Sequence, residues 1–259
     1  MGNFAAALRV QFRVVTAILL RELGSRHGGD AFGMIWLLLE PSLITLVVIT
    51  LHLAGGNQII NSVPVVIFLL TGYVPHLMYR HAGLAGIIAL TANSGLLYHR
   101  QVHFVDIVFA RLLLEIIAVL LGFIIIYAGF YAYGSIHLPK SIAMIYLGWF
   151  LHIWFIAAMC FLFTGGCLIW PLLRRLFMPI ALFMLFPYAA FFMLSWMTPK
   201  VRYWLLFFPP ANASEVMRDG YFGASALTFY DIPYTIEACL FLTFIGLVVM
   251  FRGREHLEL

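Results

Sequence analysis

Apolar residues occur along this chain in six long, nearly uninterrupted runs that are separated by short polar stretches. A helix crosses a bilayer with about 20 apolar residues. The runs cover residues 33–54, 63–80, 105–133, 142–169, 176–197 and 232–251. The second run is the shortest and can extend beyond Arg80, whereas the third is long enough to tilt. We therefore predict an all-α integral membrane protein with six transmembrane helices.

A different pattern precedes the first run, over residues 4–27. Its apolar residues recur at spacings of four and three: Phe4, Leu8, Phe12, Val15 and Leu19. Arg9, Arg13 and Thr16 lie on another face. This pattern predicts an amphipathic helix in the membrane interface, with its arginines toward the lipid head groups. The helix serves either as an anchor alone or also as a contact surface for a cytosolic partner.

Two of the connecting segments are unusual. Residues 81–104 are too polar for a span and too apolar for a free loop, which favours a short helix pressed against a partner. Residues 198–231 are rich in aromatic side chains and are interrupted by Pro209 and Pro210. Their apolar pieces are too short to span, and pieces of this length either re-enter the membrane or lie at its interface. Backbone bent at membrane depth must be shielded by protein or line a wet cavity.

Charge is scarce, and its placement indicates the orientation. Charged residues make up 10% of the chain, against about 25% in soluble domains. The net charge of +4 is too small and scattered for nucleic-acid binding. With the N-terminus in the cytosol, eleven arginines lie on the cytosolic side and four basic residues on the other: Lys140, Lys200, Arg202 and Arg218. This asymmetry places both termini in the cytosol.

The sequence carries no signature of catalysis or metal binding. Cys160, Cys167 and Cys239 lie in apolar runs without the spacing of metal ligands. The phosphate-binding GxxxxGK[ST] motif and the HExxH motif do not occur. We therefore expect no catalytic residue, no metal and no cofactor in this chain.

The dipeptide Glu40-Pro41 lies inside the first apolar run. A lone carboxylate in hydrocarbon costs roughly 2.5–3.5 kcal/mol on insertion scales, and a proline removes a backbone donor and kinks the helix. We interpret the pair as a kink whose carboxylate is satisfied, either by Arg111 or by capping a neighbouring helix. The alternative is a role in gating or in contact with cargo.

Five motifs stand in order along the chain: REL..R.GG from Arg21, G..W.LLEP over 33–41, N..LLYHRQV over 93–102, D...AR...E over 106–115, and NASEVMRDGYFG over 212–223. Together they resemble the membrane subunit of Gram-negative capsular polysaccharide ABC exporters, a branch of the type-two ABC exporters that includes O-antigen exporters. The resemblance covers essentially the whole chain, residues 1–259, as one transmembrane domain.

The resemblance implies a working unit of two copies of this chain and two copies of a separate cytosolic ATPase, which binds ATP and Mg. The cargo would be a lipid-linked capsular polysaccharide, moved across the bacterial inner membrane to periplasmic and outer-membrane export proteins. Residues 198–231 would form re-entrant helices at the periplasmic mouth. Membrane lipids complete the expected partners.

The resemblance also implies that the interfacial helix and a coupling helix at 91–103 contact the ATPase. Asn93 would cap the coupling helix. The candidate contact residues are Arg21, Glu22, Arg26, Asn93, Leu96, Leu97, Tyr98, His99 and Arg100. The alternative for the first three is a solvated run that satisfies the positive-inside rule.

A polysaccharide path needs surfaces that hold sugar rings weakly, and aromatic faces do so through apolar C–H contacts. The candidates for the path are Trp36, Tyr73, Trp154, Phe191, Trp196 and Tyr203. The alternative for each is ordinary packing. Glu215, Arg218 and Asp219 are spaced for local pairing on one helix, and either form a solvated helix end or orient the hairpin and receive polymer at the exit.

Other functions remain open at this point. Within transport, the cargo can be another lipid-linked glycan, resembling O-antigen, or a small amphiphile. An enzyme acting on lipid-linked sugars would need a cluster of acidic or basic groups, against which the scarcity of intramembrane charge argues. An ion-coupled transporter would work without any ATPase.

Overall fold

The computed structural model describes residues 2–25, 31–56, 59–60, 63–98 and 102–256. The fold is all-α apart from a short antiparallel strand pair, β1 (Ile59–Ile60) and β2 (Val63–Pro64). The helices are α1 Gly2–Ser25, α2 Ala31–Ala54, α3 Val65–Ala92, α4 Phe104–Ala132, α5 Ile142–Ile169, α6 Leu172–Phe183, α7 Pro199–Leu206, α8 Pro209–Phe222 and α9 Ile232–Gly253.

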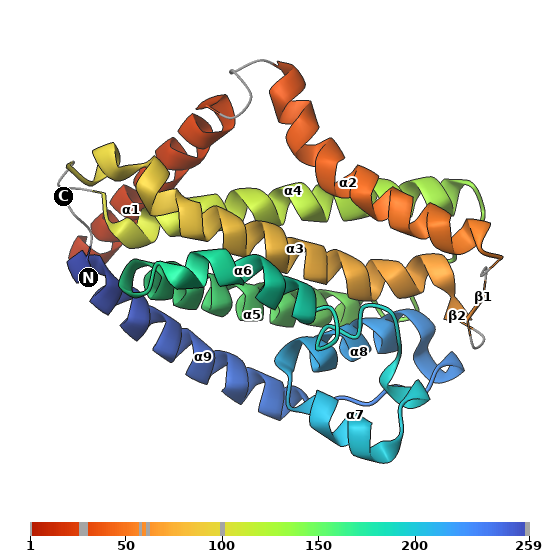
Figure 1. Cartoon of the computed structure of the whole chain (residues 1–259). Helices are drawn as coiled ribbons and strands as arrows, with labels where there is room; N and C mark the ends of the chain where they lie inside the picture. Colours follow the sequence, from red (N-terminus) through yellow and green to blue (C-terminus); the bar gives the residue numbers. More distant parts are fainter. Residues whose placement is uncertain (1, 26–30, 57–58, 61–62, 99–101, 257–259) are drawn as a thin grey trace.

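Helices α3, α4 and α5 run side by side through the bundle (Figure 1). Helices α1 and α2 pack on α4, and α8 and α9 pack on α5. The first half of α3 is buried on all sides, from Val65 to Tyr79, which is why its sequence is apolar without an amphipathic period. Two glycines bring α5 and α9 into backbone contact: a Cβ on Gly165 would lie 2.4 Å from Met250 Cα, and one on Gly246 2.7 Å from the Ala158 carbonyl oxygen.

The two ends of the bundle differ in what they carry (Figure 1). The start of α1 and the end of α9 lie together at one end, whereas β1, β2, α7 and α8 lie toward the opposite end. Among the described residues, three helices are long and apolar enough to cross a membrane: 104–132, 142–169 and 232–256. They coincide with the third, fourth and sixth apolar runs.

The second apolar run extends beyond Arg80, because residues 81–92 form the second half of α3 and do not belong to a connecting loop. Small residues make this possible, because they let the helix approach its neighbours closely. A Cβ on Gly83 would lie 2.3 Å from the Phe177 ring, and one on Gly86 2.3 Å from Cys160 Sγ. The helix expected at 91–103 is reduced, within the described residues, to a 3-10 helix at Ser94–Tyr98.

The apolar run at 176–197 is not one continuous helix. Helix α6 ends at Phe183, and the chain then passes through turns to a 3-10 helix at Leu194–Trp196. Pro187 lacks a backbone donor, and Ala189 has a φ of 48°, in the left-handed region that is unfavourable for a residue with a Cβ. Hydropathy alone did not reveal this break, because the residues that form it are as apolar as those of a helix.

Candidate functional site

A charge pair is buried completely at the end of the bundle that carries α7 and α8, which we call the hairpin end. Arg218 Nη1 lies 3.0 Å from Glu215 Oε1, and both side chains are 0% exposed. The same guanidinium donates to the carbonyl oxygens of Phe192, at 2.9 Å, and Ala189, at 2.7 Å. It also lies 4.8 Å above the Phe68 ring. The broken segment after α6 therefore supplies the acceptors that make the buried charge tolerable.

Glu215 connects this arrangement to two further backbone segments. Its Oε1 accepts a hydrogen bond from the Leu194 amide at 3.3 Å, and its Oε2 accepts one from the Phe229 amide at 3.2 Å. The preceding residue on α8 is Ser214, whose Oγ donates to the Tyr188 carbonyl oxygen at 2.9 Å. We call Ser214, Glu215 and Arg218, with their backbone partners, the hairpin clamp.

Two more polar residues of α8 bind the segments on either side of it. Asn212 Nδ2 donates to the Leu206 carbonyl oxygen at 2.8 Å, and its Oδ1 accepts from the Asp231 amide at 2.8 Å. Asp219 Oδ2 accepts from the Tyr230 hydroxyl at 3.1 Å. Burial, and then this bond, raise the pKa of Tyr230. The motif over 212–223 is thus the structural centre of the hairpin.

The structure decides between the two interpretations of the acidic and basic residues on α8. A solvated helix end is wrong for Glu215 and Arg218, because both side chains are withdrawn from solvent. The local pairing is present at the expected i, i+3 spacing. Asp219 is half-buried and bonds within the chain.

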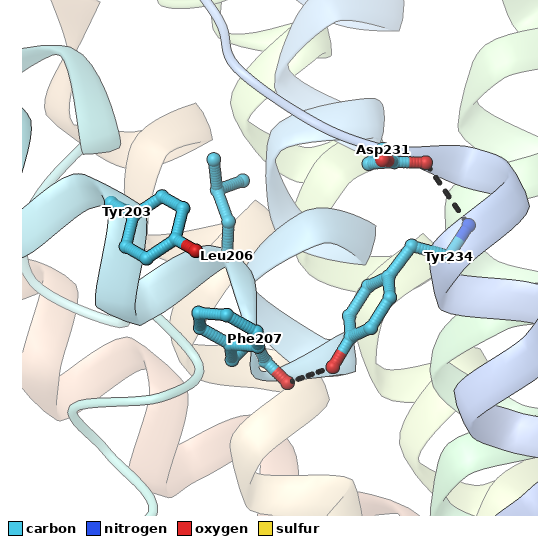
Figure 2. A pocket seen from close by; sticks show the side chains of 5 residues that line it. All are labelled: Tyr203, Leu206, Phe207, Asp231 and Tyr234. Atoms are coloured by element: carbon cyan, nitrogen blue, oxygen red, sulfur yellow. Dashed lines mark hydrogen bonds between the residues drawn. The ribbon is translucent and has the colours of Figure 1, made fainter.

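One path candidate, Tyr203, lines a cavity of about 210 Å³ between α7 and the start of α9 (Figure 2). The other lining residues are Leu206, Phe207, Asp231 and Tyr234. The Tyr234 hydroxyl donates to the Phe207 carbonyl oxygen at 2.8 Å. The Asp231 side chain caps α9, because its Oδ1 accepts from the backbone amide of Tyr234 at 3.0 Å. The Tyr203 side chain is 62% exposed, so this cavity lies at the surface of the chain.

Of the other aromatic candidates, the structure brings Tyr73 and Phe191 together, with ring centroids 5.8 Å apart. His52, which sequence reasoning missed as a partner, stacks on Phe191 at the same centroid distance. Trp196 packs on Phe68, at 5.2 Å, and therefore borders the hairpin clamp.

The remaining two aromatic candidates lie on other elements. Trp154 of α5 donates to Thr243 Oγ1 of α9 at 3.1 Å, an ordinary interhelical bond. Trp36 lies on α2 and is 38% exposed. The six candidates therefore do not form one continuous stripe within a single chain.

At the opposite end, a second set of polar side chains joins α1, α3 and α4. Glu22 forms an ion pair with Arg111 and accepts a hydrogen bond from Asn93 Nδ2 at 2.7 Å. Asn93 Nδ2 also reaches the Ala89 carbonyl oxygen at 3.0 Å. Close by, the Gln11 amide donates to the Asp106 carboxylate. We call Glu22, Asn93 and Arg111 the terminal network.

The terminal network corrects three expectations. Glu22 and Asn93 are buried, 4% and 5% exposed, so their side chains hold helices together instead of presenting a contact surface. Asn93 caps the C-terminus of α3, where its Nδ2 donates to the Ala89 carbonyl oxygen, instead of the start of a helix at 91–103. Arg111 pairs with Glu22 and not with Glu40, the partner expected from the sequence. The sequence did not indicate this pair, because the two residues are 89 positions apart and no local pattern links them.

Glu40 and Arg111 nevertheless border the same cavity, of about 360 Å³. Arg80, His81 and Glu115 also line it, and His81 Nδ1 lies 3.8 Å from Glu115 Oε2. Glu40 is exposed on α2, and Pro41 lies buried inside the same helix. Five ionisable groups around one cavity are unusual in so apolar a chain, and the motif D...AR...E contained two of them.

Apart from Glu22 and Asn93, the expected ATPase-contact residues divide into three groups. Arg21 is exposed on α1. Leu96 and Leu97 are half-buried in the 3-10 helix that Tyr98 ends. Arg26, His99 and Arg100 lie outside the described residues.

The long apolar helices, the scarcity of charge and the exposed apolar side chains of α4 and α9 define a multi-pass helical membrane protein. No family model matches the chain. It is 32% identical, over 99% of its length and 97% of the relative's, to the capsule polysaccharide export inner-membrane protein CtrC of Neisseria meningitidis.

Two further relatives align over nearly the whole chain. The capsule polysaccharide export inner-membrane protein BexB of Haemophilus influenzae is 30% identical over 99% of this chain and 97% of its own. The polysialic acid transport protein KpsM of Escherichia coli is 26% identical over 97% of both. This chain belongs to the family of capsule polysaccharide export inner-membrane proteins, and it is a protein of the bacterial inner membrane.

Proposed function

We propose that this chain is the permease subunit of an ATP-driven exporter that moves a lipid-linked capsular polysaccharide from the cytosol to the periplasm. The observation that carries the proposal is the alignment, over 97–99% of the chain, with relatives named for capsule polysaccharide export. The chain itself transports and performs no covalent chemistry.

The proposed topology has six spans: α2, α3, α4, α5, the segment that begins with α6, and α9. Helix α1 lies in the cytosolic interface, α7 and α8 form a re-entrant hairpin at the periplasmic mouth, and both termini are cytosolic. The bend after Phe183 supports this, because backbone bent at membrane depth needs protein partners. The hairpin clamp supplies them through Arg218 and Glu215.

The working unit is a homodimer that binds two copies of a cytosolic ATPase, in which ATP and Mg are bound. Apolar side chains exposed on α2 and α6 support the dimer, among them Leu46 and Val47 of α2 and Leu182 and Phe183 of α6. The ATPase contacts Arg21, Arg26 and the segment 96–100. Periplasmic and outer-membrane export proteins receive the polymer.

The terminal network offers a route from the ATPase to the path. A displacement of α1 acts through Glu22 on Arg111 of α4 and on Asn93 at the end of α3. Helix α3 carries the buried Tyr73, whose ring packs against Phe191. The exposed ring of Phe191 offers polysaccharide an aromatic surface. Glu40 and Pro41 gate the cytosolic side, beside the cavity that Arg111 borders.

The test is deletion of the gene in the bacterium that encodes it, followed by complementation. We expect surface polysaccharide to disappear, polymer to accumulate inside the cell, and the plasmid-borne gene to restore export. The tagged chain should copurify with an ATPase that contains a phosphate-binding loop. Full surface polysaccharide without the gene, or export by the isolated chain reconstituted without ATPase, would contradict the proposal.

A further inference from the structure

An apolar groove lies between α1 and α4, the two helices that the Glu22–Arg111 ion pair also joins. Its cavity of about 560 Å³ is within the range of small-molecule sites, about 300–1,000 Å³. The lining is mostly hydrocarbon, from Phe12, Val15 and Leu19 of α1 and from Phe109 and Leu113 of α4. The Phe12 and Phe109 side chains are 74% and 40% exposed, so the groove is open along its length.

Two arginines stand beside this groove. Arg9 and Arg13 are both exposed on α1, one turn apart. Arg9 precedes the lining residue Thr16 by seven positions, which is close to two full turns, so the two lie on the same side of the helix. Arg13 follows Arg9 at the i+4 position, so both arginines lie on the side of α1 that borders the Thr16 edge of the groove.

The side-chain amide in the lining of the groove is already engaged. Gln11, which also lines it, donates its amide to the Asp106 carboxylate. The other oxygen of Asp106 accepts the His103 amide at 3.0 Å. This leaves an apolar trough with positive charge at one edge, a combination that matches an acyl chain attached to an anionic head group.

We propose that the α1–α4 groove binds one phospholipid of net negative charge, with an acyl chain along Val15 and Leu113 and the phosphate at Arg9 and Arg13. The lipid holds α1 at the membrane surface and against α4, the helix that carries Arg111. This inference goes beyond the proposed function and does not depend on it, because lipid retention is measured without ATP or glycan.

The experiment compares phosphatidylglycerol and phosphatidylcholine of equal chain length on the purified full chain, by native mass spectrometry in mild detergent. Each arginine near a charged surface contributes about 1 kcal/mol, which for two corresponds to about 30-fold preference. We expect one phosphatidylglycerol per chain, retained with a preference of that order. Equal retention of the two lipids by the native chain would overturn the proposal.

Two pairs of variants separate the charge from the groove. Arg9→Gln with Arg13→Gln should remove the preference, whereas Arg174→Gln with Arg175→Gln, exposed residues of α6, should keep it. Val15→Trp fills the groove and should reduce retention of both lipids, whereas Leu20→Trp, at a residue 62% exposed on α1, should not. Equal losses in a variant and its control would show nonspecific attraction and overturn the site. Circular dichroism checks that each variant is folded.

Discussion

The hairpin clamp and the terminal network use the same chemistry in different settings. In the clamp, the Arg218 and Glu215 side chains are both 0% exposed, and backbone groups from three segments bond to them, which leaves Arg218 Nε without a partner among the described residues. In the terminal network, Arg111 is 14% exposed and borders a cavity of about 360 Å³. A buried pair that is bonded to several backbone groups resists rearrangement, whereas a pair beside a cavity has room to move. The comparison indicates a rigid hairpin end and an adjustable terminal end.

The largest effect is expected from Arg218→Ala. Removing one partner of a buried pair leaves an uncompensated charge, at a cost of about 3–5 kcal/mol, and it also frees the carbonyl oxygens of Ala189 and Phe192. We expect membrane-inserted protein to fall severely, measured by fluorescence-detection size exclusion.

Two controls accompany this variant. Arg175→Ala removes an equal charge from an exposed position and should be tolerated. The double variant Glu215→Gln with Arg218→Met should recover part of the loss, because no charge is then buried alone. Normal abundance of Arg218→Ala would show that the clamp does not hold the hairpin.

Glu22→Ala should be less damaging. Arg111 can still reach water through the cavity, so we expect destabilisation of about 1–3 kcal/mol and a lower melting temperature. Export should fall further than abundance, because α1 is released from α3 and α4. Glu22→Gln keeps an acceptor for Asn93 and should be intermediate. A drop in export that only follows abundance would leave the network a packing feature.

Trp196 and Tyr203 sharpen the comparison within the hairpin end. Trp196 packs on Phe68 beneath the clamp, whereas Tyr203 is 62% exposed at the surface cavity. Trp196→Ala should therefore lower abundance, and Tyr203→Ala should slow export while abundance stays near the native level. Surface polysaccharide per inserted chain is the measurement. Proportional losses of both quantities in Tyr203→Ala would favour packing alone.

The smallest effect is expected from Tyr230→Phe, which removes the hydroxyl bond to Asp219 at a cost of about 0.5–1.5 kcal/mol. Burial, and then Asp219, raise the pKa of Tyr230. The stabilising contribution is therefore complete below the unfolded pKa of about 10 and declines as the pH rises above it.

Melting temperatures of the native chain and of Tyr230→Phe should accordingly differ by a constant amount from pH 6 to 9 and converge at higher pH. Tyr146→Phe serves as the control, because Tyr146 lies on α5 and is 71% exposed. This variant should leave the melting temperature unchanged over the whole pH range. A difference that grows with pH would contradict the assigned bond.

Much of the fold follows from hydropathy and much of the site does not. The runs at 105–133 and 142–169 match α4 and α5 because a long apolar stretch has few alternatives to a helix in lipid. The spacing of Glu215 and Arg218 on one helix likewise predicted their pairing. The contacts of Glu22 with Asn93 and Arg111 were not predictable, since they join residues 71 and 89 positions apart.

The amino-acid sequence by itself determined that this protein is helical and lies in a membrane, because 64% apolar residues in long runs leave no other way to satisfy the backbone. Only the tertiary structure decided where the run at 176–197 breaks and what compensates the break. The reason is physical. Ala189 and Phe192 can leave the helix because their carbonyl oxygens accept hydrogen bonds from Arg218, which is distant in sequence, and these bonds in turn stabilise the buried charge of Arg218.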